Sequence, residues 1–253
     1  MTVSERIHRA NAAVECEKLM SRHVYLHAAG IHREEIENYW TGSDECTWAH
    51  NFGQMGDKAN YTHNYAENQE YDVGQNFREL VKVYPELLDK DKVPDPRATY
   101  EEAMHFTASP IIEVAEDGQT AKGLFYTPGV IFSTLNPEQA REGTWMWERY
   151  GVDFVWEDGR WLFKNLKVCC DMGGPMDLPN WPLLPKDPPP EPEEMDEEAA
   201  QHTMSVTHPG PLHYEISPTQ MPQKRPFMPV PYKTFSETYP LSTLTGIYEE
   251  AAE

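Results

Sequence analysis

Hydrophobic positions recur at helical spacing in the first part of the chain, over residues 5–28. Charged side chains take the other directions, which is the pattern of an amphipathic helix that packs one face on a core. Gly30 follows and predicts the end of this helix. The apolar stripe consists of Ala13, Cys16, Met20 and Val24.

Three titratable rings lie near the end of this predicted helix. At about 100° per residue, His27 falls close to the centre of the apolar stripe, His23 on its flank and Tyr25 well off it. Two interpretations are open: a polar helix end that faces water, or the acid–base wall of a pocket. The position of His27 favours the second.

Further elements are predicted before residue 100. Residues 31–40 have the pattern of a short second helix, and residues 46–53 alternate like a strand. Residues 74–90 predict a third amphipathic helix that is interrupted or ended before Pro85. The polar and aromatic stretch between them, residues 56–74, predicts a loop or an irregular sheet edge.

The period changes to that of β-strands from residue 100 onward. Glu-Asp-Gly turns at Gly118 and Gly159 predict β-hairpins. Helices followed by long antiparallel strands predict an α+β fold, in which helices cover one face of a curved sheet. No glycine-rich nucleotide-binding motif is present. The β-rich segments are 100–117, 119–135, 143–158 and 159–171.

The 253-residue chain has a formal net charge of −21. Such a charge repels phosphate backbones and anionic membranes, so no nucleic acid and no membrane is expected as a partner. The first residues lack the pattern of an export signal, and no apolar run is long enough to span a bilayer. We therefore expect a cytoplasmic protein. Reduced, buried thiols are expected at Cys16, Cys46, Cys169 and Cys170.

Composition divides the chain near residue 171, because 16 of the 22 prolines follow that position. We predict a globular domain over residues 1–171 and a tail over residues 172–253. The tail begins as a proline- and acid-rich spacer and ends as an aromatic, extended C-terminal arm. This arm is expected to pack on its own domain or on a neighbouring subunit, the alternative being a flexible tail. Its apolar residues are Phe227, Tyr232, Phe235, Tyr239, Leu241 and Tyr248.

Three stretches together resemble the SnoaL-like branch of the NTF2-like superfamily over roughly residues 5–170. They are LMSRHVYLHAAGIHREEIENYW, MHFTASPIIEVAEDGQTAKGLF and ERYGVDFVWEDGRWLFKNLKV. The resemblance implies a cone-shaped α+β barrel, with a bent antiparallel sheet around the long N-terminal helix and a deep apolar pocket. Relatives of the scytalone dehydratase, ketosteroid isomerase, bile acid dehydratase and diarylpropane lyase types transfer protons on bulky rings without an organic cofactor. Other members only bind partners.

The end of the first helix departs from the pattern of that family. Members usually have a tyrosine, an aspartate five residues later, and then Gly-Asp-Trp. Here the corresponding positions hold His23, Ala28 and residues 30–32, which are Gly-Ile-His. The usual aspartate base is therefore absent, and a histidine is the expected base.

The strands retain the family pattern in part. The histidine that opens the family's HxxTxxP strand is His105, whereas Ser109 replaces the usual asparagine. On the closing hairpin Tyr150 is kept, and Val152 replaces a frequent aspartate.

We predict His105, His27 and Tyr25 as catalytic residues. A water-poor pocket shifts an imidazole pKa into the range useful for proton transfer, and a phenol can hold a substrate oxygen. The alternatives are histidines that only bond a backbone carbonyl or fill the core, and a Tyr25 that only packs. Predicted substrate-binding residues are His23, Trp48, His50, Tyr126, Trp147, Arg149 and Tyr150.

The predicted pocket is rich in aromatic residues, which suits a flat aromatic or polycyclic substrate. Arg149 and Asp153 share a strand face, and we expect them to pair with each other. Aromatic side chains that belong either to the pocket or to the sheet core include Phe52, Phe125 and Trp145.

The histidines offer only part of a metal site. His23 and His27 have HxxxH spacing, and His50 or His105 could supply a third ligand. However, no glutamate follows His23 as in HExxH, and the family works without metal. No metal or other cofactor is expected.

The preferred function is that of a cofactor-independent lyase or isomerase acting on a bulky hydroxylated aromatic or steroid-like molecule. Loss of water and retro-aldol loss of an aldehyde both remain open. The alternatives are a non-catalytic binding or scaffold protein and, on the histidines alone, a metal-dependent hydrolase or oxygenase. By resemblance we expect a homo-oligomer, a trimer or a dimer.

Overall fold

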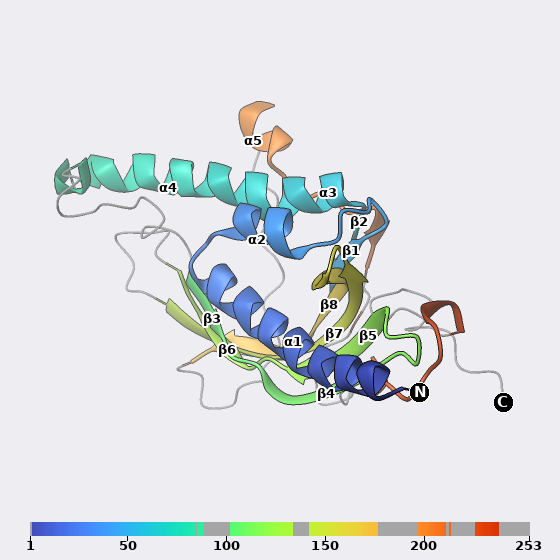
Figure 1. The fold of residues 1–253 in the computed structure, drawn as a ribbon. Helices are drawn as coiled ribbons and strands as arrows, with labels where there is room; N and C mark the ends of the chain where they lie inside the picture. Colours follow the sequence, from blue (N-terminus) through green and yellow to red (C-terminus); the bar gives the residue numbers. More distant parts are fainter. Residues whose placement is uncertain are drawn as a thin grey trace.

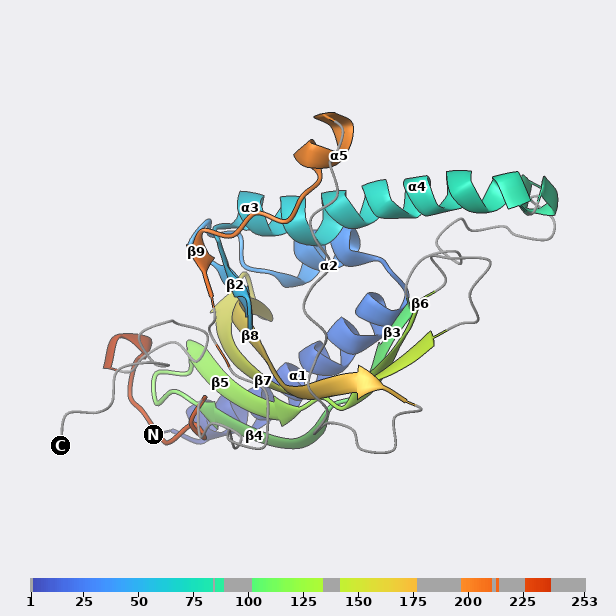
Figure 2. The same ribbon diagram turned by 180° about the vertical axis from the view of Figure 1, so that it is seen from behind.

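Helix α1 (Val3–Ala28) lies along the concave side of a bent, unclosed sheet, as Figure 1 shows. Helices α2 (His32–Tyr39), α3 (Lys58–Thr62) and α4 (Asn68–Val83) lie beyond the end of α1 and cover the opening between helix and sheet (Figures 1 and 2). This arrangement confirms the predicted α+β class. The computed structural model describes residues 2–83, 85–88, 102–133, 142–176, 197–210, 213 and 226–237.

Both ends of α1 follow from its sequence. Thr2 and Glu5 form a capping box, in which each side chain accepts a hydrogen bond from the backbone N–H of the other. At the other end Gly30 has a φ of 63°, which glycine adopts without strain. Its N–H donates to the carbonyl of His27, and the N–H of Ile31 donates to the carbonyl of Leu26. This Schellman motif confirms the predicted helix end.

Two short elements follow the Schellman turn. Helix α2 (His32–Tyr39) matches the predicted second helix. The single strand predicted over residues 46–53 is instead a hairpin of β1 (Thr47–His50) and β2 (Gly53–Gly56).

The loop predicted over residues 56–74 is wrong. This stretch forms α3 (Lys58–Thr62), a π-helical turn (His63–Glu67) and the start of α4 (Asn68–Val83). Its polar composition gives weak helix propensity, but Tyr61 and Ala66 are buried in the core, and such packing outweighs propensity. The predicted helix end before Pro85 is confirmed, and a 3-10 turn (Pro85–Leu88) follows.

The sheet has the order β3-β6-β7-β8-β1-β2-β9, and β5 pairs with both β4 and β7. Most pairs are antiparallel as predicted, but β1 runs parallel to β8. A long hairpin of β7 and β8 forms its centre. Beyond β1 and β2, the strands are β3 (Glu102–His105), β4 (Ala108–Val114), β5 (Thr120–Tyr126), β6 (Gly129–Ser133), β7 (Glu142–Glu157), β8 (Arg160–Pro175) and β9 (His208–Pro209).

The predicted hairpin turns are confirmed. Asp158 and Gly159 both have positive φ, 49° and 79°, and they join the paired residues Glu157 and Arg160. Two central residues of this kind make a turn whose twist matches that of the flanking strands. Gly118, with φ 70°, lies in the turn between β4 and β5.

The core lies between α1 and the concave face of the sheet. The four cysteines are buried there or in the sheet with free thiols, as predicted. No helix within the described ranges is long and apolar enough to cross a membrane. Side chains that form this core include Cys16, Met20, Trp40, Phe125, Val152, Phe154, Phe163 and Leu166.

The predicted ion pair between Arg149 and Asp153 is wrong. Four residues along a strand span about 13 Å, whereas directly opposed residues on neighbouring strands are about 5 Å apart. Asp153 accordingly pairs with Lys122, its partner in register, at 3.0 Å. Arg149 binds both carboxylate oxygens of Asp171, at 2.7 and 2.8 Å, and His213 also binds Asp171.

The described parts of the tail lie against the domain. Helix α5 (Glu197–Gln201) precedes β9, which extends the sheet beside β2. Further along, Tyr232 is buried, and its hydroxyl lies 3.1 Å from that of Thr120. Its carbonyl accepts a hydrogen bond from the N–H of Glu116. The division of the chain at residue 171 stays a prediction, and Tyr239, Leu241 and Tyr248 of the predicted arm lie outside the described residues.

We predict that Tyr232→Ala lowers the free energy of unfolding by about 3 kcal/mol, because it removes a buried aromatic ring. Urea denaturation measures this change. The matched control is Val230→Ala, two residues away and 69% exposed, which should change the free energy by less than about 0.5 kcal/mol. Equal stability of the two variants would show that this segment does not pack on the domain.

Candidate active site

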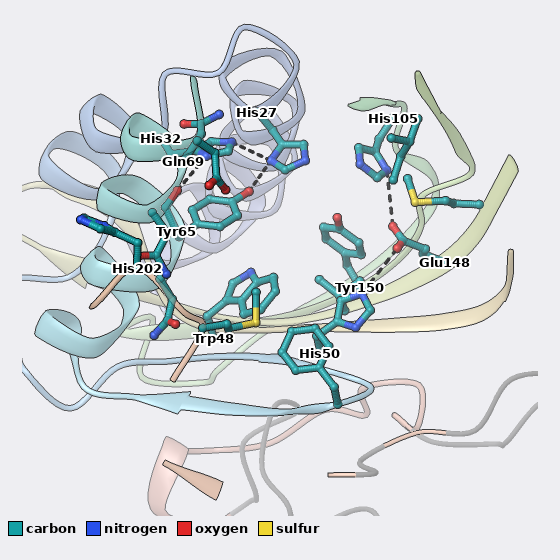
Figure 3. Close-up of a pocket in the computed structure, with 18 residues that line it drawn as sticks. His27, His32, Trp48, His50, Tyr65, Gln69, His105, Glu148, Tyr150 and His202 are labelled. Carbon is teal, nitrogen blue, oxygen red and sulfur yellow. Dashed lines mark hydrogen bonds and ion pairs between the residues drawn. The ribbon is translucent and has the colours of Figure 1, made fainter. Parts of the chain in front are cut away.

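A pocket of about 400 Å³ lies between the end of α1, the π-helical turn and the sheet. Histidines and aromatic rings dominate its wall, as Figure 3 shows. A volume in this range suits a small organic ligand. The side chains that line it are His27, His32, Trp48, His50, Phe52, Asn64, Tyr65, Asn68, Gln69, Asp72, His105, Ile131, Met146, Glu148, Tyr150, Val168, His202 and Met204.

Three residues form a connected group on one wall. The Schellman turn reverses the chain after His27, so that Nε2 of His32 lies 2.9 Å from Nδ1 of His27. Nδ1 of His32 donates to the backbone carbonyl of Tyr65 at 2.9 Å. The hydroxyl of Tyr65 contacts Nδ1 of His27. Tyr65 belongs to the π-helical turn, an irregularity that is frequent at functional sites.

A second group faces the first across the pocket (Figure 3). Glu148 is 3% exposed and lies between two histidines: its Oε2 is 3.4 Å from Nδ1 of His105, and its Oε1 is 3.9 Å from Nε2 of His50. The His105 ring also bonds the backbone of Thr127. The ring centroids of His27 and His105 are 5.2 Å apart, so the two groups contact each other at these rings.

Burial favours the uncharged form of three histidines and one tyrosine of the pocket. Burial and the neighbouring histidines lower the pKa of His27 well below 6.5, and burial lowers that of His32 to about 4. Burial also lowers the pKa of His105, although the charge of Glu148 opposes this shift. Burial and the charge of Glu148 raise the pKa of Tyr150 well above 10. At neutral pH the pocket therefore offers neutral imidazoles, which accept protons, and a phenol that donates a hydrogen bond.

Several buried polar atoms of the pocket wall have no hydrogen-bond partner among the described residues. Such atoms are rare in folded proteins, because each costs about 1–3 kcal/mol. Their concentration here indicates a wall that is completed by a polar ligand or by water. The atoms are Nε1 of Trp48, Nδ1 of His50, Oδ1 of Asn68, Nδ1 of His105, Oε2 of Glu148 and Nδ1 of His202.

The C-terminal tail supplies part of the wall through His202 and Met204. His202 stacks on Tyr71 of α4 with ring centroids 3.9 Å apart. The side chain of Asn64 donates to the carbonyl of Ser205 at 2.8 Å and accepts from its N–H at 2.6 Å. These contacts fasten residues 202–205 across the edge of the pocket.

The structure brings together part of the predicted site. His27 and His105, predicted as catalytic, both line the pocket. So do the predicted substrate-binding residues Trp48, His50 and Tyr150. Their roles stay predictions.

The other predicted residues do not line the pocket. Tyr25 is 79% exposed, because it points off the buried stripe of α1. Tyr126 and Trp147 lie on the outer face of the sheet, with ring centroids 6.2 Å apart and both rings exposed. Arg149 has the same orientation and is held by Asp171. We therefore leave these four residues out of the site.

His23 is buried behind the pocket. Its Nδ1 lies 2.8 Å from Oε1 of Glu35, which also accepts a hydrogen bond from Nε1 of Trp40. The His23 ring is stacked against that of His27 at 5.8 Å. A structural role in the core fits this position, and the role of His23 in substrate binding stays a prediction.

Several lining residues were not predicted from the sequence. Tyr65 lies in the stretch assigned to a loop, and His202 and Met204 lie in the tail. Glu148 alternates with Trp147, and the sequence did not determine which strand face lines the pocket. His32 replaces the tryptophan that is usual in the family, which was the one signal that could have identified it. Within the part of the chain that the structure describes, no cluster of His, Cys, Asp and Glu has the arrangement of a metal site.

Comparison with known families matches residues 9–167 to the model of the SnoaL-like domain. The chain belongs to the SnoaL-like family. This assignment confirms the predicted NTF2-like class of fold, with its long N-terminal helix inside a bent sheet.

Solved structures similar to this SnoaL-like domain are distant. A candidate scytalone dehydratase from Novosphingobium aromaticivorans is 13% identical, with 68% of this chain and 91% of that chain covered and a TM-score of 0.45. The Kfla4162 protein from Kribbella flavida is 10% identical, with 65% and 94% covered and a TM-score of 0.47. LinA is 14% identical, with 72% and 99% covered and a TM-score of 0.41. No curated protein matches the chain.

We predict that stability falls as the pH drops from 6.5 toward 4. Above pH 6.5 His32 is neutral in both the folded and the unfolded chain. Below it the unfolded chain binds a proton that the folded chain, with a His32 pKa of about 4, does not bind. The loss from His32 alone amounts to roughly 3 kcal/mol.

Urea denaturation across this pH range measures the effect, with His32→Gln as the variant that lacks the titrating group. The free energy of unfolding of His32→Gln should decline less steeply than that of the wild type. Parallel pH profiles of the two proteins would contradict the buried, neutral state of His32.

Proposed function

We propose that this protein is a cofactor-independent lyase that removes a proton and a leaving group from a hydroxylated ring compound. The proposal depends on one observation: two imidazoles whose pKa is lowered by burial, those of His27 and His105, lie next to each other in the pocket wall, with Glu148 beside His105. Positioned groups of this kind catalyse proton transfer without a cofactor.

His27 is the better candidate for the base. One ring nitrogen of His105 lies 3.4 Å from Glu148, and the ring also bonds the Thr127 backbone. The His27 ring contacts His32 and Tyr65 through the same nitrogen, and its other edge faces the pocket (Figure 3). In this proposal His105 is a positioning residue that orients the carboxyl group of Glu148.

The reaction follows from these positions. His27 takes a proton from carbon or from a hydroxyl of the substrate, and the electron pair of the broken bond forms a new double bond. The leaving group departs with a proton from the hydroxyl of Tyr65 or Tyr150, and His27 then returns its proton to that tyrosine. Glu148 accepts a hydrogen bond from a second substrate hydroxyl. Loss of water and retro-aldol loss of an aldehyde are both compatible with these proton transfers and bond changes.

The pocket also indicates the class of substrate. Aromatic rings such as Trp48 and Phe52 suit a flat aromatic or polycyclic molecule. Of the described residues that line the pocket, none is Lys or Arg, whereas Glu148 and Asp72 are acidic. Carboxylates and phosphates would lack a counter-charge here. We therefore expect neutral phenolic diols, hydroxysteroids or related hydroxylated compounds as substrates.

We predict that His27→Ala lowers kcat/KM by about 10²–10⁴-fold on any compound of this class that the wild type converts. Screening of phenolic diols and hydroxysteroids, followed by steady-state kinetics, measures it. The control is His208→Ala on β9, an exposed histidine outside the pocket, which should keep wild-type kinetics. Unchanged turnover in His27→Ala would contradict the mechanism.

Tight binding of these compounds without turnover would favour the alternative, a non-catalytic small-molecule-binding or scaffold protein. The expected homo-oligomer, a trimer or a dimer, also stays a prediction. Light scattering on the purified protein tests it, and a monomeric mass would contradict it.

A further inference from the structure

We infer that His32 is a positioning residue that fixes the protonation of His27, so that Nε2 of His27 is the atom that accepts the substrate proton. This inference rests on the proposed function and assigns the role of one nitrogen atom in it. The hydrogen positions follow from the partners of each ring nitrogen.

The assignment starts at a backbone oxygen. A carbonyl oxygen only accepts hydrogen bonds, so Nδ1 of His32, 2.9 Å from the carbonyl of Tyr65, carries a hydrogen. Burial keeps His32 neutral at pH 7, with a pKa of about 4. A neutral imidazole has one hydrogen on its two ring nitrogens. Nε2 of His32 is therefore an acceptor.

The second step concerns the contact between the two histidines. Nε2 of His32 lies 2.9 Å from Nδ1 of His27. Two bare nitrogens at this distance would repel each other, so Nδ1 of His27 carries the hydrogen of this bond. His27 is itself neutral at pH 7, because burial lowers its pKa well below 6.5. Its Nε2 is consequently bare and able to accept a proton.

The hydroxyl of Tyr65 does not change this assignment. It contacts the same Nδ1 of His27 and could in principle donate to it. If Tyr65 donated to Nδ1 of His27, Nε2 of His32 would have to supply the hydrogen of the bond between the two histidines. His32 would then carry a hydrogen on both ring nitrogens and be a cation in a buried site. The phenolic oxygen instead shares the Nδ1 hydrogen of His27.

The arrangement also stabilises the product of proton transfer. Once Nε2 of His27 has taken a proton, the ring is a cation whose Nδ1–H donates to Nε2 of His32. A charge-assisted hydrogen bond is roughly twice as strong as a neutral one. His32 thus takes the orienting place that a carboxylate holds beside many catalytic histidines.

The test is the tautomer of His27, measured by nitrogen-15 NMR of the full chain labelled at histidine. In the wild type at pH 7 we expect Nδ1 of His27 to be protonated and Nε2 to be bare. In His32→Leu, which removes the acceptor, we expect the hydroxyl of Tyr65 to donate to Nδ1, and the hydrogen of His27 should move to Nε2. His32→Gln keeps an amide oxygen near the former position of Nε2 and should retain the wild-type tautomer.

Tyr65→Phe completes the set, because it removes the hydroxyl and leaves the histidine pair intact. The tautomer of His27 should be that of the wild type. If His27 of the wild type carries its hydrogen on Nε2, or if Tyr65→Phe rather than His32→Leu moves it, the inference is overturned. The wild-type and Tyr65→Phe spectra decide this even where His32→Leu does not fold.

Kinetics separate this inference from the proposed function. Where a substrate is found, His32→Leu should lower kcat by about 10²–10⁴-fold with little change in KM, and His32→Gln should recover most of the loss. The expected tautomer without turnover of any compound would count against the proposed function alone. Turnover with the opposite tautomer would count against the role of His32 alone.

Discussion

The pocket depends on the way in which α1 ends. Gly30 adopts a backbone conformation that other residues reach only with strain, and the resulting Schellman turn reverses the chain within two residues. This reversal places His32 against His27, although α1 and α2 are separate helices. A helix that ran straight on would carry His32 past the opening of the sheet, and the two imidazoles would not meet.

Burial then determines the chemistry of these side chains. Water stabilises the charged forms of histidine and tyrosine, so removing it lowers the pKa of the imidazoles and raises that of the phenol. The same burial makes each unpaired polar atom costly. The pocket wall therefore combines neutral imidazoles and a neutral phenol with the carboxyl group of Glu148, together with buried polar atoms that have no partner among the described residues. Both properties suit proton transfer on an uncharged molecule.

The tail belongs to this site as much as the helices do. Residues 202–205 form part of the pocket wall, and β9 extends the sheet beside β2. Farther along, Tyr232 packs on the turn between β4 and β5, on the other side of the sheet. From its composition this region was predicted to be a spacer and an arm. Prolines and acidic residues dominate the composition, and the few positions that make contacts change it little.

Elements whose signals are local could be predicted from the amino-acid sequence. The period of α1, its end at Gly30 and the Asp-Gly turns depend on neighbouring residues, and the wording of three segments was sufficient for the family. The sequence also placed His27 on the buried stripe, since angular position along a helix needs no knowledge of the rest of the fold.

The contacts that those residues make depend on the tertiary structure. Helix formation over residues 56–74 depends on the burial of Tyr61 against the core, which outweighs a poor local propensity. The sheet paired Asp153 with Lys122 on the next strand, because cross-strand neighbours are closer than residues four apart on one strand. The contacts of His27 with His32 and Tyr65 likewise depend on three elements that lie close together in space. The spacing of these residues along the chain does not predict that proximity.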